Sequence, residues 1–572
     1  MNQSFNKLTF KALFLVAGLM TSQYSQASEI EMQWQKVDLK IELFYKLIRS
    51  GNCHKSQKQF LGCVVAAERV LDFCDKSEKI ASGSRLNSKY MRKIIADFGP
   101  LKVVDWDIKS ALQANSKMEF NKKRTSQMEA DVVSLYETYI QEGKDVDFEE
   151  IIAWTASRCL NKSNESYATS QAFTGYYQIT EDTHSQLVPK VFIEQKRATN
   201  TEKYSGKGFG VAANFNQLVI ESVYPNSPAE NAGLMQGDIV TAVNGERVTA
   251  TNQDRFIQKM NGNKLALTVK RADKIVNIKM EAQVFDIRNV NYRMLRSSNT
   301  LIGQVKIEAF DNRKVCEDVE RAVRILENEG AQGIILDLRN NPGGLVNMGI
   351  CVTNVFIAKN LQVLEYRPID AREELEIYST LTEPATSLPL VVLVNGGSAS
   401  ASEIVSGILQ EHERAIIVGE QTFGKGVIQS AKLWKHDFGS GYSYSNSSIE
   451  KLQTSAFYHI LPSQRSLQGQ GIKPDITAHR FPNMNPDEHY SFRETDLFNS
   501  PQPLTFVEWK PKNAFHIDSI AQCTTDFGRA KESFEKNQNS DYQLNVGRDV
   551  LGCIIEGIPG QYTASLSRFS KI

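Results

Sequence analysis

Three serines stand at alternate positions in the segment Asn395–Val405, which reads NGGSASASEIV: Ser398, Ser400 and Ser402. The apolar run LPLVVLV precedes them, and the helical pattern SEIVSGILQEH follows. A serine at the N-terminus of a helix lies near unpaired backbone N–H groups and the positive end of the helix dipole, where an oxyanion would be stabilised. The pattern therefore allows one of these serines to act as a nucleophile.

The same serines also fit a purely structural role. Residues 400–403 read SASE, which matches the capping box S-x-x-E that satisfies the first N–H groups of a helix. No histidine lies close to the segment on its N-terminal side, and the next one along the chain, His412, falls at the far end of the expected helix. On this segment alone, capping and catalysis both stay open, and a catalytic serine needs a base from elsewhere.

A second segment, Gly419–Gly426, reads GEQTFGKG and follows the strand pattern AIIVG. Its spacing imitates a phosphate-binding loop, in which glycine, four residues and Gly-Lys precede a Ser or Thr that ligates Mg²⁺. Here the residue after the lysine is Gly426, and the next run, VIQSAKLW, alternates like a strand instead of continuing as a helix. We therefore reject a nucleotide-binding loop.

Lys425 is instead a candidate general base. It lies between two glycines, which leave room for a partner to approach, and Phe423 and Val427 can exclude water. Burial lowers the pKa of a lysine, and the neutral amine can take a proton from a serine. On a strand, Gln429 would share a face with Lys425 and could orient the amine. The alternative for Lys425 is a solvated turn lysine.

The segment DLRNNPGGLV, residues 337–346, follows a strand with a glycine turn. Exposed N–H groups of Gly343 or Gly344 could form one half of an oxyanion hole. The N–H of Ala401, the residue after Ser400, would form the other half. The alternative is a plain turn between a strand and a helix.

A further segment, EDTHSQLVP, holds His184 close to Asp182. This pair would permit a Ser-His-Asp arrangement with one of the serines above. We prefer the lysine, because the lysine arrangement accounts for more of the sequence.

The elements that must position these residues form an α/β pattern over residues 284–480. The runs NTLIGQVKIEAF, GIILDLRNNPGG, LPLVVLVNGG and AIIVG are expected strands, and DNRKVCEDVERAVRILENEG is an amphipathic helix with Asp311 or Asn312 as its N-cap. Continuous apolar strands that alternate with helices predict a layered α/β core.

Residues 204–283 change character, because apolar and polar positions alternate there between turn residues. The stretch resembles a PDZ domain in GFGV, in SPAENAGLMQGDIVTAVNG and in the later helix. The N–H groups around a glycine turn can hold the terminal carboxylate of a peptide, and the adjoining strand edge can add the peptide as a strand. The expected peptide-binding residues are Gly208, Phe209, Gly210 and Val211.

The ends of the chain carry other signals. Residues 1–27 combine Lys7 and Lys11 with the short apolar run ALFLVAGLM and SQA, which is typical of a secretory leader and too short to span a bilayer. Residues 28–165 show helical spacing and no chemical motif, residues 166–203 are expected to begin the α/β core, and residues 481–572 form a mixed, mainly helical end. The sequence predicts no integral membrane span and places the protein in the periplasm or outside the cell.

Eight cysteines in an exported chain favour disulfides. They fall into three groups, and we expect pairing within each group: Cys53, Cys63, Cys74 and Cys159; Cys316 and Cys351; Cys523 and Cys553. Their spacing is not that of a zinc site. Lys plus Arg and Asp plus Glu number 66 each in the 572 residues, so no charge excess points to nucleic acid or to a membrane surface.

The chemistry-bearing segments together resemble the carboxy-terminal processing proteases, also called tail-specific proteases. The matching segments, in the family's order over residues ~170–480, are DTHSQLVP, the PDZ-like stretch, GIILDLRNNPGG, NGGSASASEI, GEQTFGKGVIQ and LPSQRSLQGQGIKPDI. Two departures stand out: a threonine follows Asp182 where the family more often has proline, and LWKHDFGSGYSYSNSSIEKLQ is longer than the usual hairpin.

The resemblance assigns roles to the candidate residues. It implies Ser400 as the nucleophile, Lys425 as the general base, Gln429 as its support, and Gly344 or Gly343 with Ala401 as oxyanion donors. It also implies a core of the ClpP/crotonase-like type with an inserted PDZ domain, and neither a metal nor an organic cofactor.

The expected substrates are proteins or peptides with free C-termini, which dock on the PDZ domain. The N-terminal domain is a place where an adaptor protein could bind. The rival interpretation is a catalytically inactive PDZ protein that binds partners, and intact Ser400, Lys425 and Gln429 argue against it.

Overall fold

The computed structural model describes the core of the chain and parts of both ends. The described residues are 33–53, 55–56, 58–59, 62–63, 66, 165–198, 202–214, 217–223, 227–235, 238–248, 260, 263–271, 274–287, 289–297, 300–439, 441–480, 493–497, 499–503, 507, 514–527, 529–536 and 541–556. The expected leader 1–27 and the cysteines Cys74 and Cys159 lie outside them.

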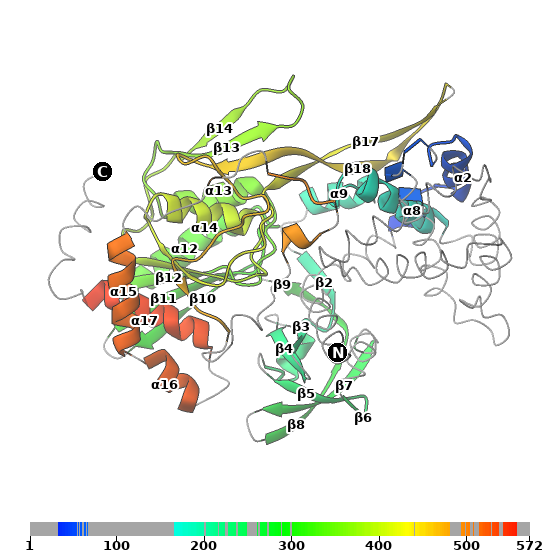
Figure 1. Cartoon of the computed structure of the whole chain (residues 1–572). Coiled ribbons are helices and arrows are strands. Elements are labelled where there is room, and N and C mark those ends of the chain that lie inside the picture. The colour runs from blue at the N-terminus through cyan, green and yellow to red at the C-terminus, as the bar shows by residue number, and fades with distance from the viewer. Residues whose placement is uncertain are drawn as a thin grey trace, which may run out of the picture.

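A six-stranded sheet forms the centre of the α/β core (Figure 1). Its strands, in spatial order, are β10 Val290–Ser297, β11 Thr300–Ile307, β12 Gly333–Asp337, β15 Leu390–Val394, β16 Ile416–Gly419 and β20 Ile476–Thr477. From β11 to β20 every pairing is parallel, and β10 is antiparallel to β11. All residues of β12 and β15 are buried. This confirms the α/β core that the continuous apolar runs predicted.

Helices cover both faces of this sheet. In β12, Ile334 and Leu336 pack among α12 Val315–Asn328, α13 Val346–Asn354 and α14 Ala401–Glu411. Ile335 points to the opposite face, where it meets α15 Ala514–Phe527, α16 Arg529–Lys536 and α17 Tyr542–Glu556. The helical C-terminal segment is therefore the second helical layer of the core and not an appendage to it.

A second sheet closes the other side of α13 and α14. Its path runs β1 Gln186–Pro189, β18 Tyr442–Ile460, β13 Gln362–Pro368 and β14 Glu376–Ser379, and β17 Val427–Gly439 and β19 Arg465–Ser466 also pair with β18. Tyr458 and Ile460 of β18 join the same core cluster as α14. The catalytic candidates thus lie where the two sheets meet, since α14 begins at one and β17 belongs to the other.

The long segment that departs from the family's usual hairpin is the β17–β18 ribbon, which extends away from the core in Figure 1. Its outer part packs on α2 Ile41–Arg49 and α8 Glu165–Thr180, with Phe173 of α8 and Trp434 of β17 in edge contact at 5.1 Å between ring centroids. The helical pattern around residue 45 is confirmed. α2 and α8, which lie on either side of the expected boundary at residue 165, share one hydrophobic cluster.

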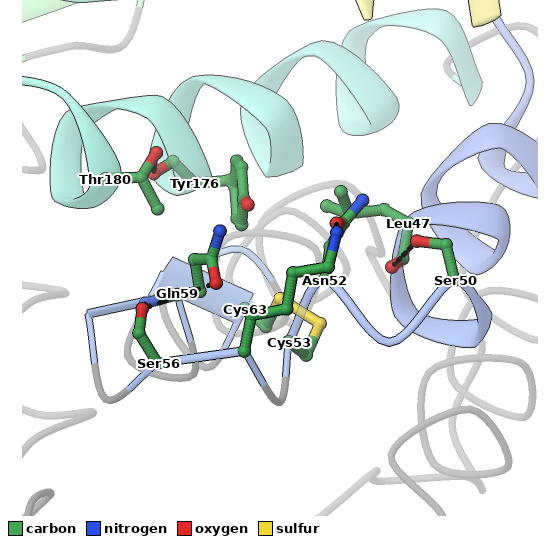
Figure 2. Close-up of a disulfide and its surroundings, with 10 residues drawn as sticks. Leu47, Ser50, Asn52, Cys53, Ser56, Gln59, Cys63, Tyr176 and Thr180 are labelled. Carbon is green, nitrogen blue, oxygen red and sulfur yellow. Dashed lines mark hydrogen bonds between the residues drawn. A yellow bond between two sulfur atoms is a disulfide. The ribbon is translucent and has the colours of Figure 1, made fainter. Parts of the chain in front are cut away.

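A disulfide between Cys53 and Cys63 fastens the turn that follows α2. Figure 2 shows it beneath α8, close to Tyr176 and Thr180. Gly62 lies so close to this helix that an added Cβ would be 3.0 Å from Thr180 Cγ2. The pair falls within the first cysteine group, for which the sequence allowed three connectivities. The other two expected pairs, Cys316–Cys351 and Cys523–Cys553, are also present.

The PDZ-like segment forms its own sheet, with the order β3–β4–β5–β7–β8 and β6 beside β5. The strands are β3 Phe209–Asn214, β4 Gln217–Val223, β5 Ile239–Val243, β6 Glu246–Arg247, β7 Lys264–Arg271 and β8 Lys274–Glu281, with the short helix α10 Pro228–Asn231. A two-stranded connection of β2 Glu202–Gly206 with β9 Gln283–Ile287 joins it to the core, and α9 Lys190–Ala198 precedes β2.

One local prediction is wrong. The N-cap of α12 is Lys314, without a side-chain cap, and not Asp311 or Asn312. Asn312 Oδ1 accepts a hydrogen bond from Lys314 N at 2.8 Å, so its side chain closes a turn one step before the helix begins. Asparagine favours such turns as strongly as it favours caps, and the sequence pattern does not separate the two.

No helix among the described residues is long and apolar enough to cross a membrane. Within the same residues, no group of three or more His, Cys, Asp or Glu side chains could hold a metal ion.

The Cys316–Cys351 disulfide joins α12 to α13 and closes a separation of 35 residues. We predict that replacing both cysteines by alanine lowers the free energy of unfolding by about 2–4 kcal/mol, because the unfolded chain regains the entropy of the open loop. Urea unfolding of the oxidised protein measures this. The double variant should respond less to a reducing agent than the wild type does, and an unchanged unfolding midpoint would show that the bridge contributes nothing.

Candidate active site

The serine turn is built by the ends of two neighbouring strands. Asn340, after β12, and Asn395, after β15, bind each other twice: Asn340 N donates to Asn395 Oδ1 at 2.9 Å, and Asn395 Nδ2 donates to Asn340 Oδ1 at 2.8 Å. Carboxyl ends of parallel strands meet at one edge of a sheet, where sites in α/β folds form. The asparagine pair locks the two turns together at that edge.

The serines on either side of Ser400 hold this turn in place. Ser398 Oγ donates to Leu338 O at 2.8 Å, and Ser402 Oγ donates to Asn341 O at 2.9 Å. Both side chains are buried. They therefore tie the start of α14 to the loop after β12.

Ser400 differs from its neighbours in backbone and exposure. It has a φ of +54°, which is unfavourable for a residue with a side chain and costs on the order of 1–3 kcal/mol. It is half-buried, whereas Ser398 and Ser402 are fully buried. A sharp turn that presents the middle serine is the backbone geometry expected of an exposed nucleophile.

Glu403 binds the serine turn to the lysine loop. Its Oε2 accepts hydrogen bonds from the backbone N–H groups of Ser400 and Lys425, each at 2.8 Å. Its Oε1 accepts from Gly424 N at 2.7 Å and from Thr422 Oγ1 at 2.6 Å. One carboxylate oxygen thus binds the backbones of both Ser400, the candidate nucleophile, and Lys425, the candidate base. The expected role of Glu403 at the helix start is present, but it is a small part of what this side chain does.

The Glu403 side chain carries this role while fully buried. Burial raises its pKa to about 7, and the hydrogen bonds from Thr422, Gly424, Ser400 and Lys425 oppose the rise. All four partners point donors at the carboxyl oxygens, so they limit the rise in pKa that burial causes without cancelling it.

Lys425 lies in the loop just before β17, between the buried residues Phe423 and Val427. Burial lowers the pKa of its amine, although the carboxylates of Glu494, Asp182 and Glu403 act in the opposite direction. Its Nζ donates to Gln429 Oε1 at 3.2 Å. The expected lysine–glutamine contact is therefore present. It does not come from simple strand alternation, because β17 begins at Val427 and has a register shift between Ile428 and Gln429.

Gln429 connects the lysine to the DTHS segment. Its Nε2 donates to the backbone carbonyl of His184 at 2.6 Å, which fixes the amide so that its oxygen faces Lys425. The imidazole of His184 points elsewhere: its Nε2 lies 2.7 Å from Glu494 Oε1, and His184 N donates to Asp182 Oδ1 at 2.8 Å. The structure thus places His184 beside the lysine through its backbone, with the ring paired to a carboxylate.

Gly426 lies where two segments of backbone nearly touch. A Cβ at this position would lie 2.2 Å from Gln468 N, and Gly426 N donates to Gln468 Oε1 at 2.9 Å. The residue that excluded a nucleotide-binding loop is therefore glycine because the segment before β20 passes against it.

The glycine turn after β12 faces the nucleophile candidate. A Cβ on Gly343, which has a φ of +96°, would lie 2.7 Å from Ser400 Cβ and 2.9 Å from Ala401 N. Gly343 N itself donates to Asn341 Oδ1 at 2.9 Å. Because Gly343 N is already used, Gly344 is the candidate oxyanion donor of the two expected glycines, beside Ala401.

The expected peptide-binding residues lie on β3 and just before it. β3 pairs with β4 alone among the described strands, so its other edge can take a further strand. Phe209 and Val211 are buried in the core of the PDZ sheet, so their backbone groups, not their side chains, are available to a peptide. Gly208 has a φ of +76° and packs against Ser227, whose Oγ donates to Gly208 O at 3.1 Å.

Sequence reasoning missed three contributors to the site. Thr422 could have been found, because it belongs to the same TFGKG segment as the lysine. Gln468 lies in the matching segment LPSQRSLQGQGIKPDI, which gave it no role of its own. Glu494 belongs to no motif and reaches the site only through the tertiary fold.

Two segments of the chain match known protein families. Residues 301–478 match the model of Peptidase family S41, and residues 219–271 match that of a PDZ domain. A probable CtpA-like serine protease of Staphylococcus aureus is 29% identical over 323 residues, which are 55% of this chain and 61% of that protein. A carboxy-terminal-processing protease of Bartonella bacilliformis is 30% identical over 306 residues, which are 52% of this chain and 66% of that protein.

The chain thus spans about 61% of the length of the first of these relatives. Among solved structures, a photosystem II D1 C-terminal processing protease superposes with a TM-score of 0.38 and 21% identity, over 65% of this chain and 92% of that one. A similarity this low supports no inference about the site.

We predict that Glu403→Gln lowers the free energy of unfolding by about 1–3 kcal/mol, because in either orientation the amide NH₂ would face at least one backbone N–H donor that is then left unpaired. The pH dependence should change too. The pKa of Glu403 is raised from 4.5 to about 7, so the proton that the folded state binds adds to stability below pH 4.5, and this added stability is lost as the pH rises through 7. The variant should lack this slope.

Urea unfolding between pH 4 and 8 measures both effects. The matched control is Glu317→Gln, which changes an exposed glutamate in the first turn of α12 and should shift the free energy by less than about 0.5 kcal/mol. Equal effects of the two substitutions would contradict the role assigned to Glu403.

Proposed function

Because residues 301–478 carry a peptidase family S41 domain, we propose that this protein is an exported serine endopeptidase with a Ser400–Lys425 dyad. The observation that carries the proposal is the shared carboxylate of Glu403, which binds the backbone N–H of both residues at 2.8 Å. A loop whose lysine had no chemical task would not need to be fixed to a strained serine turn through a buried charge.

Lys425 acts as the general base. Burial lowers the pKa of its amine toward the range in which the neutral form is present at working pH. Gln429 holds the amine through its Oε1, so the lone pair of Lys425 can be directed to the serine hydroxyl. Lys425 takes the Ser400 proton as Oγ attacks the scissile carbonyl, and returns it to the leaving amine.

The tetrahedral oxyanion binds to the N–H groups of Gly344 and Ala401. Ala401 is the first residue of α14, so its N–H is one of the unpaired donors at the positive end of the helix. Collapse of the intermediate leaves an acyl ester on Ser400. Lys425 then activates a water molecule that hydrolyses the ester.

The substrate is a protein with a free C-terminal tail, which adds to the open edge of β3. Support comes from the PDZ match and from the position of that edge, which lies on a separate sheet that strands β2 and β9 connect to the core. Export is supported by the leader pattern in residues 1–27 and by three disulfides among the described residues.

We predict that Ser400→Ala and Lys425→Ala each reduce cleavage of an unfolded protein with an apolar C-terminal tail by at least about 10³-fold, since each removes a group that makes or breaks bonds. Ser398→Ala is the matched control. It removes a buried structural serine. The variant should therefore be less stable than the wild type, but its folded form should still cleave the substrate. Cleavage rates on a gel with one tailed substrate measure all three variants. Full cleavage by Ser400→Ala would disprove the dyad.

Tail recognition has a separate test. We predict that amidation of the substrate's C-terminus lowers kcat/KM by about tenfold or more, because the PDZ turn loses the carboxylate that its N–H groups bind. The comparison uses one substrate with a free or an amidated end and the same internal sequence. Equal kcat/KM values for the two would argue that the tail is not recognised.

A further inference from the structure

The segment that follows the S41 match returns to the active site. Residues 493–503 include the short helix η3 Glu494–Asp496, the isolated orange turn near the centre of Figure 1. Glu494 N donates to Phe423 O at 3.0 Å, so this segment is fixed to the loop that carries Lys425. Asn499 binds the other side, where its Nδ2 donates to the carbonyls of Gln178, Ile179 and Glu181 at the end of α8. The segment thus spans from α8 to the lysine loop.

This segment brings a buried carboxylate to the site. The Glu494 side chain has no exposed surface. Its Oε1 accepts hydrogen bonds from His184 Nε2 at 2.7 Å, Ser500 Oγ at 2.7 Å and Gln468 Nε2 at 2.9 Å. Burial acts to raise the pKa of Glu494, but His184 and these hydrogen bonds outweigh it, and the pKa lies below its ordinary value. Glu494 is therefore an ionised carboxylate inside the protein.

A continuous series of contacts leads from Glu494 to the amine of Lys425. Glu494 holds the His184 ring, the His184 carbonyl accepts from Gln429 Nε2 at 2.6 Å, and Gln429 Oε1 accepts from Lys425 Nζ at 3.2 Å. The charge also acts directly. Three carboxylates face the lysine from three elements and favour its protonated form: Glu494 in η3, Asp182 after α8, and Glu403 in α14.

We propose that Glu494 is a positioning residue of this active site, which fixes Gln429 through His184 and sets with its charge the pH at which Lys425 can accept a proton. This inference rests on the proposed function because it takes Lys425 to be the base. The contacts from Glu494 to Lys425 do not depend on that function. It assigns a catalytic task to a segment that lies outside residues 301–478.

The effect on pH has a defined sign. A negative charge near an amine raises the pKa of that amine, so removing the charge lowers it. Glu494→Gln keeps the shape and an acceptor oxygen but removes the charge. The neutral amine of Lys425 should then appear at a lower pH, and the acid limb of the activity profile should move down by about one pH unit. A substitution that merely loosened the fold would lower the rate without moving this limb.

The test compares three variants: Glu494→Gln, Glu494→Asp and Glu365→Gln. Glu365 is the matched control, because it is another buried glutamate beside a histidine, His459, with Oε1 to Nδ1 at 3.4 Å, and it is not among the charges that face Lys425. The first readout needs no catalysis. Acetic anhydride labels amines only in the neutral form, so the pH midpoint of Lys425 acetylation, followed by mass spectrometry in a Ser400→Ala background, reports its pKa directly.

We expect Glu494→Gln to lower the acetylation midpoint of Lys425 by about one pH unit and Glu365→Gln to leave it unchanged. Glu494→Asp keeps the charge but retracts it from His184. This variant should lower kcat several-fold with little change in KM and keep the acid limb within a few tenths of a pH unit. If Glu494→Gln fails to fold, the aspartate variant still decides, since wild-type kcat in a folded Glu494→Asp protein would overturn the positioning role.

The two proposals can fail separately. If Ser400-dependent cleavage occurs and the acetylation midpoint does not move in Glu494→Gln, the inference about Glu494 is wrong and the dyad stands. If the midpoint moves but the wild type shows no Ser400-dependent cleavage, the coupling between Glu494 and Lys425 stands and the proposed function is wrong.

Discussion

The buried carboxylate of Glu403 is the contact on which the geometry of this site depends. Four donors converge on its two oxygens: the backbone N–H groups of Ser400, Gly424 and Lys425, and the hydroxyl of Thr422. A buried carboxylate is costly unless donors surround it, so losing any of these four donors would leave part of that cost without compensation. The strained backbone of Ser400 and the close loop of Lys425 can therefore persist together.

Other contacts connect this centre to the rest of the fold. Arg339, just after β12, donates to both oxygens of Asp337 and to both oxygens of Asp541, which precedes α17. This network joins the strand before the glycine turn to the C-terminal helical layer. On the opposite side, residues 493–503 connect α8 with the lysine loop. The terminal segments, which hold no recognisable motif, thus surround and fix the part of the chain that does.

Much of this arrangement could be predicted from the sequence, for reasons that differ between elements. The strands of the central sheet are continuous apolar runs, and an apolar run bounded by glycine turns identifies a buried strand directly. Residue types and spacing within short segments were enough to indicate the serine turn, Lys425 and Gln429. The N-cap of α12 was predicted wrongly, because an asparagine side chain can close a turn as well as cap a helix, and Asn312 closes a turn.

Contacts between segments that lie far apart in the sequence could not be predicted. Glu403 reads as a helix-capping residue, because three of its four partners lie about twenty residues away. The contact between Glu494 and His184 joins residues 310 positions apart, and no local pattern encodes it. The contacts of α8 with α2 and with the β17–β18 ribbon could not be predicted for the same reason, because these partners lie far away in the sequence.

The central claim is that Ser400, and no neighbouring serine, is activated for covalent chemistry. The most direct measurement is to treat the wild-type protein with a peptidyl diphenyl phosphonate, which forms a stable bond only with an activated serine, and to locate the added mass by peptide mapping. The account predicts one phosphonate per chain, on Ser400. Modification of Ser398, Ser402 or any other residue, or no modification under conditions in which the protein cleaves its substrate, would contradict it.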